Sequence, residues 1–227
     1  MGFVTKLRMK CFNCGEPNDF PALTSFHIKG SYDLDLRPPE TARSTLKYRV
    51  NRCPSCGYCA YALPKGSNSF KNTLKSELYL NQLNSSEYPE LANTFLCISM
   101  LFAGDKYYAI AVISAIQASW VCDDLQPDQA INCRRKALEY YELVKSEGQS
   151  LTTNPICDQL VIADLLRRCN EFDKSIKIVE DTFSPKLEAN IQQGLIYEKH
   201  LAENRDAKCH TFEEAKEYAE SREKSPN

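Results

Sequence analysis

The spacing of apolar side chains changes near Gly66. Before this residue, apolar and polar positions alternate with the period of two that suits strands, as in Leu46 to Val50. After it, apolar residues recur every three or four positions, the spacing of one buried helix face. We therefore predict a mainly α protein with two domains: a small β head over residues 1–66 and a helical domain over residues 67–227.

Four sets of apolar positions predict helices in the second domain. They are Leu91, Phe95, Ile98 and Phe102; Ala109, Ile113, Ile116 and Trp120; Cys133, Ala137, Tyr141 and Val144; and Ile176, Val179 and Phe183. Prolines suited to a first helical turn are Pro89, Pro127, Pro155 and Pro185. Asn154 and Ser184 are predicted N-caps, and Thr211 with Glu214 forms a capping-box pattern. The helix after Thr211 is expected to lack a core to join, with Glu217 to Asn227 frayed.

Two turns between these helices resemble those of tetratricopeptide repeats. From Ala163 to Ile176, small residues stand where two helices must approach, and an aromatic residue follows the turn. Met100 to Ile110, with Gly104 at its turn, is a looser match. Gly104 and Asn170 lie 66 residues apart, about twice the repeat period of ~34 residues. We expect tetratricopeptide-like helical hairpins with short links.

Five of the eleven cysteines cluster in the head, and four of them form two similar motifs. Residues 11–15 and 53–57 both have the pattern C-x-x-C-G. The two-residue spacing lets both sulfurs bind one ion, and the glycine permits a positive φ in the turn. Four thiolates are the ligand set of a closed structural zinc site. The predicted ligands of one structural Zn²⁺ per chain are Cys11, Cys14, Cys53 and Cys56, which makes residues 1–66 a zinc-ribbon-like head.

Other chemistries use clustered cysteines too. The alternatives are an iron–sulfur site, a redox dithiol and disulfides. Zinc is favoured because thiolates are soft ligands and four of them form a closed coordination set. Cys59 is expected to pack beside the second motif, with substitution as a ligand as the alternative. His27 is expected to be a surface or packing residue. The six scattered cysteines are expected to be small buried hydrophobes.

The segment from Tyr32 to Glu40 alternates acid and leucine before a double proline. Asp33, Asp35 and Arg37 are candidates for a recognition loop, and the alternative is a strand that ends at the prolines. Asp33 and Asp35 on one strand face are also candidates for a second metal site or an acid–base pair. Two solvated carboxylates are the preferred interpretation.

Together these segments resemble the bacterial proteins grouped as domain of unknown function 2225. The resemblance rests on residues 11–14, 33–40 and 48–58 of the head, with a looser match over 195–211. It covers most of the chain and is specific in the head. It implies a cytoplasmic bacterial protein with a metal-binding head and a tetratricopeptide-like body, and it implies no activity.

The charge and the apolar content of the sequence indicate in which compartment the chain resides and whether it contacts a membrane. The net charge is −2, with +5 in residues 1–66 and −7 in residues 67–227. Residues 1–6 lack the apolar stretch of a secretory signal, and no apolar run reaches the ~18 residues of a membrane span. We expect a soluble, cytoplasmic protein without a membrane partner.

Three functions fit these features. A non-catalytic interaction module, whose helical surface binds a protein or peptide, is preferred. The alternative is a nucleic-acid adaptor that acts through basic residues near the cysteines: Lys6, Arg8, Lys10, Lys47, Arg49 and Arg52. An enzyme is disfavoured because no H-E-x-x-H, phosphate-binding glycine loop or G-x-S-x-G motif is present. The partner and the oligomeric state are left open.

Overall fold

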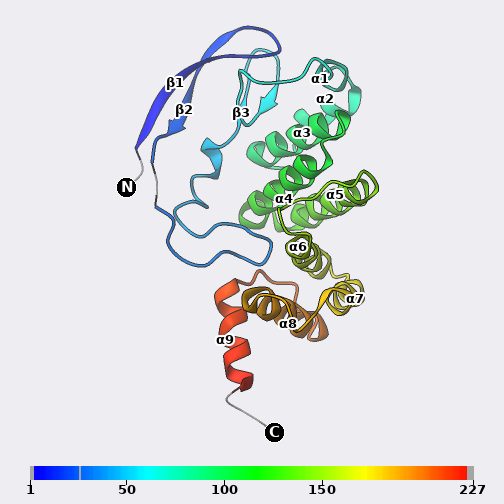
Figure 1. Cartoon of the computed structure of the whole chain (residues 1–227). Helices are drawn as coiled ribbons and strands as arrows, with labels where there is room; N and C mark the ends of the chain where they lie inside the picture. The colour runs from blue at the N-terminus through cyan, green and yellow to red at the C-terminus, as the bar shows by residue number, and fades with distance from the viewer. Residues whose placement is uncertain (1–2, 26, 224–227) are drawn as a thin grey trace. The chain divides into compact units, whose positions relative to one another are not determined.

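The computed structural model describes residues 3–25 and 27–223 (Figure 1). It confirms the predicted fold class, since the chain is mainly helical with a small antiparallel β region near its start. The chain divides into two compact units: unit 1 spans residues 1–29 and 40–147, and unit 2 spans residues 30–39 and 148–227. This grouping differs from the division expected at Gly66, and a head that folds by itself stays a prediction.

Two short hairpins form the β structure in the described part of unit 1. β1 (Val4–Lys10) pairs with β2 (Pro17–Leu23), and β3 (Asn51–Arg52) pairs with β4 (Cys59–Ala60). Each cysteine motif occupies the loop of one hairpin. The strand expected over residues 46–50 is wrong: Leu46–Tyr48 forms the 3-10 helix η1. Leu46 and Val50 are both buried and lie four residues apart, a spacing that a helical turn also satisfies.

Five helices follow in the described part of unit 1: α1 (Phe70–Leu74), α2 (Glu77–Leu83), α3 (Glu90–Gly104), α4 (Tyr108–Leu125) and α5 (Pro127–Ser146). α4 packs against both α3 and α5 (Figure 1). The predicted faces point into this core, where Phe95, Ile98 and Ala137 are fully buried. Ala111 and Ala115 of α4 are also fully buried, and their small side chains let the helices approach closely.

The described part of unit 2 combines residues 30–39 with four helices: α6 (Pro155–Arg168), α7 (Phe172–Thr182), α8 (Ala189–Glu203) and α9 (Phe212–Glu223). Its main core cluster contains Leu160, Ala163, Val179, Ile191 and Leu195. Leu34 from the early segment is fully buried against Leu201 of α8 and Ala215 of α9. The expectation that the last helix has no core to join is therefore wrong, and residues 224–227 of the expected frayed end lie outside the described part.

Most helix starts follow their sequence signals. Asn154 caps α6, because its Oδ1 accepts a hydrogen bond of 3.0 Å from Ile156 N. At α9, Glu214 N donates to Thr211 Oγ1 at 3.2 Å and Thr211 N donates to Glu214 Oε2 at 2.6 Å, which confirms the capping box. Ser184 and Pro185 do not start a helix, because residues 184–187 form a separate turn and α8 begins at Ala189.

Within the described ranges, three helices end in the same backbone motif. The residues with positive φ are Lys106 (61°) after α3, Asn170 (63°) after α6 and Arg205 (53°) after α8. In each turn the next residue donates its N–H to the carbonyl five residues earlier, at 2.9 Å: Tyr107 to Phe102, Glu171 to Leu166 and Asp206 to Leu201. These bonds define Schellman caps. The later two caps are 35 residues apart along the chain.

Among the described residues, no helix combines the length and the apolar character that crossing a bilayer requires.

Candidate metal centre

The two cysteine motifs fold into the same turn. In the first, Cys11 N donates to Glu16 O at 3.0 Å and Gly15 N donates to Cys11 O at 2.8 Å. Cys53 N and Gly57 N make the equivalent bonds in the second, at 2.8 and 2.9 Å. Both glycines have positive φ, 77° and 72°, the conformation predicted for this position. The repeated pattern in the sequence thus corresponds to a repeated backbone structure.

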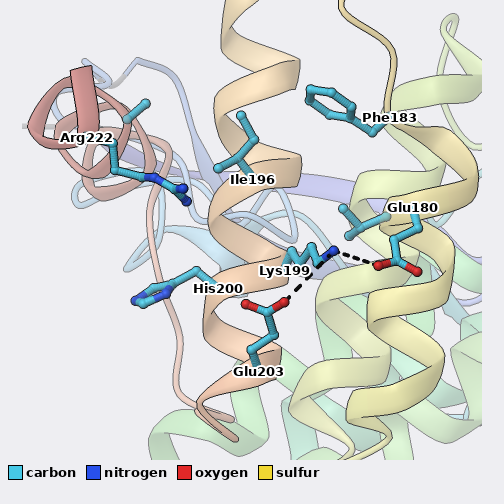
Figure 2. A pocket seen from close by; sticks show the side chains of 9 residues that line it. Glu180, Phe183, Ile196, Lys199, His200, Glu203 and Arg222 are labelled. Carbon is cyan, nitrogen blue, oxygen red and sulfur yellow. Dashed lines mark hydrogen bonds and ion pairs between the residues drawn. The ribbon is translucent and has the colours of Figure 1, made fainter. Parts of the chain in front are cut away.

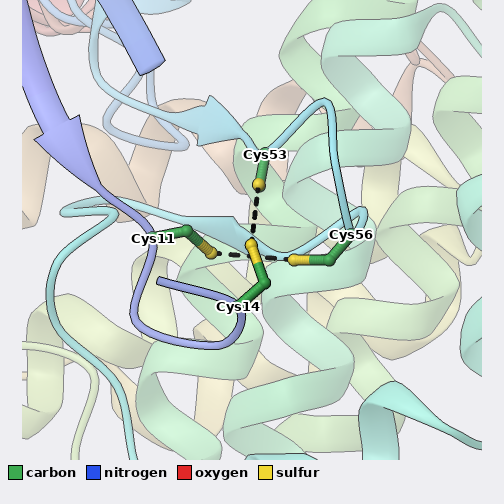
Figure 3. Close-up of side chains that lie close together, drawn as sticks. All are labelled: Cys11, Cys14, Cys53 and Cys56. Atoms are coloured by element: carbon green, nitrogen blue, oxygen red, sulfur yellow. Dashed lines mark hydrogen bonds between the residues drawn. The ribbon is translucent and has the colours of Figure 1, made fainter. Parts of the chain in front are cut away.

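The four predicted ligand sulfurs converge between the two turns (Figure 3). They all lie within 4.8 Å of one another, with 3.6 Å between the sulfurs of Cys11 and Cys56 and 3.7 Å between those of Cys14 and Cys53. Four sulfurs placed ~2.3 Å from a central zinc ion in a tetrahedron are about 3.8 Å apart. The four cysteines are therefore positioned to hold one metal ion, compatible with the predicted zinc.

The neighbouring candidates lie outside this group. Cys59 is 1% exposed and its Sγ donates to Gly57 O at 3.4 Å, so it packs behind the second turn. His27 is exposed and is not a member of the sulfur group. Four of the six scattered cysteines are buried as expected, namely Cys97, Cys122, Cys133 and Cys169. Cys157 is half-buried and Cys209 is exposed, so the expectation is wrong for Cys209.

The surroundings shift the pKa values of these thiols in different directions. Burial raises the pKa of Cys11 to about 12 and also raises the pKa of Cys56. Burial acts in the same direction on Cys53, but hydrogen bonds from the backbone N–H groups of Cys56 and Ser55 outweigh it and lower the pKa. Four adjacent thiolates would repel one another, so a cation that replaces their protons stabilises the set.

Helix α2 supports the second turn. The Tyr79 hydroxyl donates to Gly57 O at 2.9 Å, and Arg52 Nη1 donates to Leu83 O at 3.1 Å. A Cβ atom at Gly57 would clash with Leu83 Cδ2, so the helix packs directly on the turn. Sequence reasoning missed these supports, because Tyr79 is 22 residues from Gly57 and belongs to no local motif.

The acidic residues considered for a second metal site are buried in unit 2. Asp33 and Asp35 are 2% and 1% exposed, so the interpretation as solvated carboxylates is wrong. Asp35 Oδ2 pairs with Arg168 Nη1 at 2.9 Å, and Asp33 Oδ2 accepts a hydrogen bond of 3.1 Å from Cys209 Sγ. Arg37 is 4% exposed. The contacts of Asp33 and Asp35 hold the segment in place, and the three buried side chains do not present a polar recognition surface.

A buried ion-pair network lies next to this segment. Arg167 donates all five N–H groups, at 2.6–3.3 Å, to the carboxylates of Glu198 and Asp164 and to the carbonyls of Asp206 and Lys208. Burial and the neighbouring Asp164 carboxylate raise the pKa of Glu198 to about 8. Every N–H group of the guanidinium therefore has an acceptor within the protein. Because these acceptors lie on α6, on α8 and in the residues between α8 and α9, the cluster connects these three parts of unit 2.

A groove of about 700 Å³ follows one face of α8 (Figure 2). The side chains that line it come from three helices: Val179, Glu180 and Phe183 of α7; Ile196, Lys199, His200 and Glu203 of α8; and Ala219 and Arg222 of α9. Lys199 Nζ pairs with Glu180 at 2.6 Å and with Glu203 at 3.9 Å. The groove therefore combines apolar side chains with charges of both signs.

The described residues thus provide a four-sulfur centre in unit 1 and a helical groove in unit 2. Comparisons with family models, with curated proteins and with solved structures find no match to the chain, so its family resemblance stays a prediction.

Proposed function

We propose that this chain is a cytoplasmic, zinc-containing, non-catalytic interaction module whose helical surface binds a protein or peptide partner. The α8 groove is the observation that carries the proposal (Figure 2). A groove with helices on both sides and apolar side chains inside suits an amphipathic helix or an extended peptide. Phe183, 42% exposed at its edge, offers an apolar contact, and the mixed charges around Lys199 set the orientation of the partner.

The repeated helix ends support a tetratricopeptide-like body. The Schellman caps after α6 and α8 are 35 residues apart, close to the repeat period of ~34 residues. Stacked helical hairpins of this kind build extended surfaces that bind partners. The groove along α8 is such a surface in unit 2.

The group of four cysteine sulfurs supports the non-catalytic part of the proposal. Four thiolates at tetrahedral spacing suit Zn²⁺, and a full set of protein ligands leaves no coordination position for a substrate. When bound, the ion would link two turns whose cysteines are 39 and 45 residues apart in the sequence. The free thiols of such a site require a reducing compartment, which is the basis for proposing the cytoplasm.

Metal analysis tests the zinc proposal. We expect the reduced, purified chain to contain one zinc ion, measured by native mass spectrometry. Cys14→Ser combined with Cys56→Ser should lose the ion. Cys59→Ser is the matched control and should keep it, since its sulfur lies outside the group. A wild-type chain without stoichiometric metal, or equal loss in both variants, contradicts the assignment.

Photo-crosslinking tests the partner proposal independently of the metal. A photoreactive amino acid replaces Phe183 in the groove, or Leu125, which is 65% exposed in unit 1, as the control. We expect the groove position to capture one defined protein in cells and the control position not to capture it. Capture of the same products from both positions, or no product from Phe183, contradicts the proposal.

The alternative function, a nucleic-acid adaptor, is favoured by one observation on β1. Lys6, Arg8 and Lys10 are exposed at alternate positions, so their side chains share one face of the strand. A basic row of this kind can contact phosphates, and binding would weaken steeply with salt. A mobility-shift assay with random DNA and RNA at ~50 mM salt tests it. A shift that Lys6→Gln with Lys10→Gln abolishes supports the adaptor, and no shift excludes it.

A further inference from the structure

A second hollow in unit 2 differs in chemistry from the groove. Its volume is about 540 Å³, and it lies among segment 30–39, α6, the first turn of α8 and the start of α9. The apolar residues Leu160, Val161, Ile191 and Phe212 make up much of its lining. Among the described residues that line it, none carries a charge. The α8 groove, in contrast, contains two acidic and two basic side chains.

The walls of this hollow are held in place before any ligand binds. Leu160, Val161 and Ile191 are 2–4% exposed and belong to the interior of unit 2. On the opposite side, Phe212 N donates to Tyr32 O at 3.0 Å, and Glu213 N donates to Ser31 Oγ at 3.0 Å. The Asp35–Arg168 ion pair anchors the same segment. A preformed site of this kind loses little conformational freedom on binding.

Leu36 adds a strained backbone conformation to this site. Its φ of 66° lies in the left-handed region, where a residue with a Cβ atom is strained. Its side chain is 37% exposed and lines the hollow instead of filling the core. Strained residues of this kind are concentrated at ligand-binding and other functional sites. Leu36 therefore combines a strained backbone with an apolar side chain that is presented to the hollow.

We propose that the hollow binds a small, uncharged, largely apolar molecule, for example one built on an aromatic ring with a single hydrogen-bonding group. Its volume falls within the ~300–1,000 Å³ of small-molecule sites. A charged ligand would lose its hydration without an opposite charge in the lining. Ser31 Oγ accepts from Glu213 N and Asn190 Oδ1 accepts from Ile191 N, and each oxygen has a second lone pair that can accept from a ligand N–H group. α8 contributes its first turn alone, so the site suits a compact molecule, whereas the groove follows a helix face.

Indole is a suitable probe, because it is uncharged and carries one N–H donor. We expect a titration of the methyl-labelled full chain, followed by NMR, to shift the signals of Leu36, Leu160, Val161 and Ile191 with a Kd below about 1 mM. Indole-3-carboxylate has the same ring and a negative charge, and it should bind at least tenfold more weakly. Equal binding of both probes, or no saturable shift with indole, overturns the proposal.

Two variants test the location of the site. Asn190 is exposed at the rim, so Asn190→Trp should cover the hollow without disturbing the core and weaken indole binding at least tenfold. Leu36→Gly removes a contact from an already strained backbone, so it should fold and bind about threefold more weakly. Ser221→Trp, on an exposed part of α9, is the matched control. Unchanged binding in Asn190→Trp, or equal loss in the control, would falsify the assignment.

Discussion

Leu36 combines a left-handed backbone with a partly exposed apolar side chain. The turn that contains it is closed by Leu36 N, which donates to Asp33 O at 2.9 Å, and by Arg37 N, which donates to Asp35 Oδ1 at 3.1 Å. Buried neighbours therefore impose the conformation on a residue type that does not favour it. The strain is local, and substitution at this one position can measure it.

Replacing Leu36 by glycine and by alanine separates the strain from the side chain. Both variants lose the leucine contacts, but glycine adopts positive φ without a steric cost. We expect Leu36→Gly to be about 1 kcal/mol more stable than Leu36→Ala in urea unfolding. At Lys177, an exposed position in the middle of α7, the order should reverse, because alanine is favoured in a helix. The same order at both positions would contradict a strained Leu36.

The raised pKa of Glu198 predicts a pH dependence. A carboxyl group whose pKa is raised by folding binds its proton more tightly in the folded state than in the unfolded state. Its contribution to the free energy of unfolding is therefore fully present below pH ~4.5 and is lost as the pH rises through about 8. Urea unfolding of the wild type should show falling stability across this range. In Glu198→Gln the positive charge of Arg167 is still paired with the negative charge of Asp164. We expect the stability of this variant to change less with pH than that of the wild type. Glu203→Gln, exposed on the same helix, should retain the wild-type slope.

The metal ligands could be predicted from the sequence, whereas the buried charges could not. In each cysteine motif the two sulfurs and the glycine lie within five residues, so their geometry is local. Asp35 meets Arg168 across 133 residues, and Asp33 meets Cys209 across 176. A local sequence pattern contains no information about partners this distant. The alternating acidic residues and leucines therefore predicted a strand with solvated carboxylates.

At the scale of elements, a helix start was predicted best where side chains form hydrogen bonds with the backbone N–H groups of the first turn. The capping box of Thr211 and Glu214 starts α9 beside Asp33, which forms a single β-bridge with Thr211. The same few residues thus start the last helix and hold segment 30–39. Pro185 was misleading because proline suits turns as well as first helical turns, and its neighbours here form a turn.

The capping box gives a prediction for α9. Thr211→Ala removes the hydroxyl that accepts from Glu214 N, and we expect a loss of about 1 kcal/mol in stability. Hydrogen exchange should become faster at the first amides of α9, while α6 stays unchanged. Thr182→Ala, at the last residue of α7, provides the control because this position caps no helix start. Equal exchange in the two variants would argue against the cap.

At the scale of the whole molecule, the fold class followed from the periodicity, but the grouping of residues did not. Apolar spacing reports which face of an element is buried. It does not report which elements share a core. Residues 30–39 share a unit with helices α6, α7, α8 and α9, although more than one hundred residues separate them from α6 in the sequence. The hollow and the groove were beyond prediction for the same reason, since each is lined by segments that meet only in the folded chain.

Metal removal should affect the two units differently. The proposed zinc ion holds both cysteine turns, so chelation should expose the amides of residues 11–16 and 53–58 to rapid hydrogen exchange. Helices α6 to α9 have their own core clusters and ion pairs, and we expect their protection to persist. Exchange followed by mass spectrometry measures both at once. Equal loss of protection in α6 to α9 would contradict this division of the structure.

The membership of residues 30–39 in unit 2 has a consequence for biosynthesis. This segment leaves the ribosome more than one hundred residues before α6, so Leu34 and Asp35 must wait for Leu201 and Arg168 to be made. A fragment of residues 148–227 expressed alone would lack the Asp35 carboxylate that pairs with the buried Arg168, and it would lack Leu34 from its apolar interior. Supplying residues 30–39 as a separate synthetic peptide should complement that fragment, in the manner of a split protein.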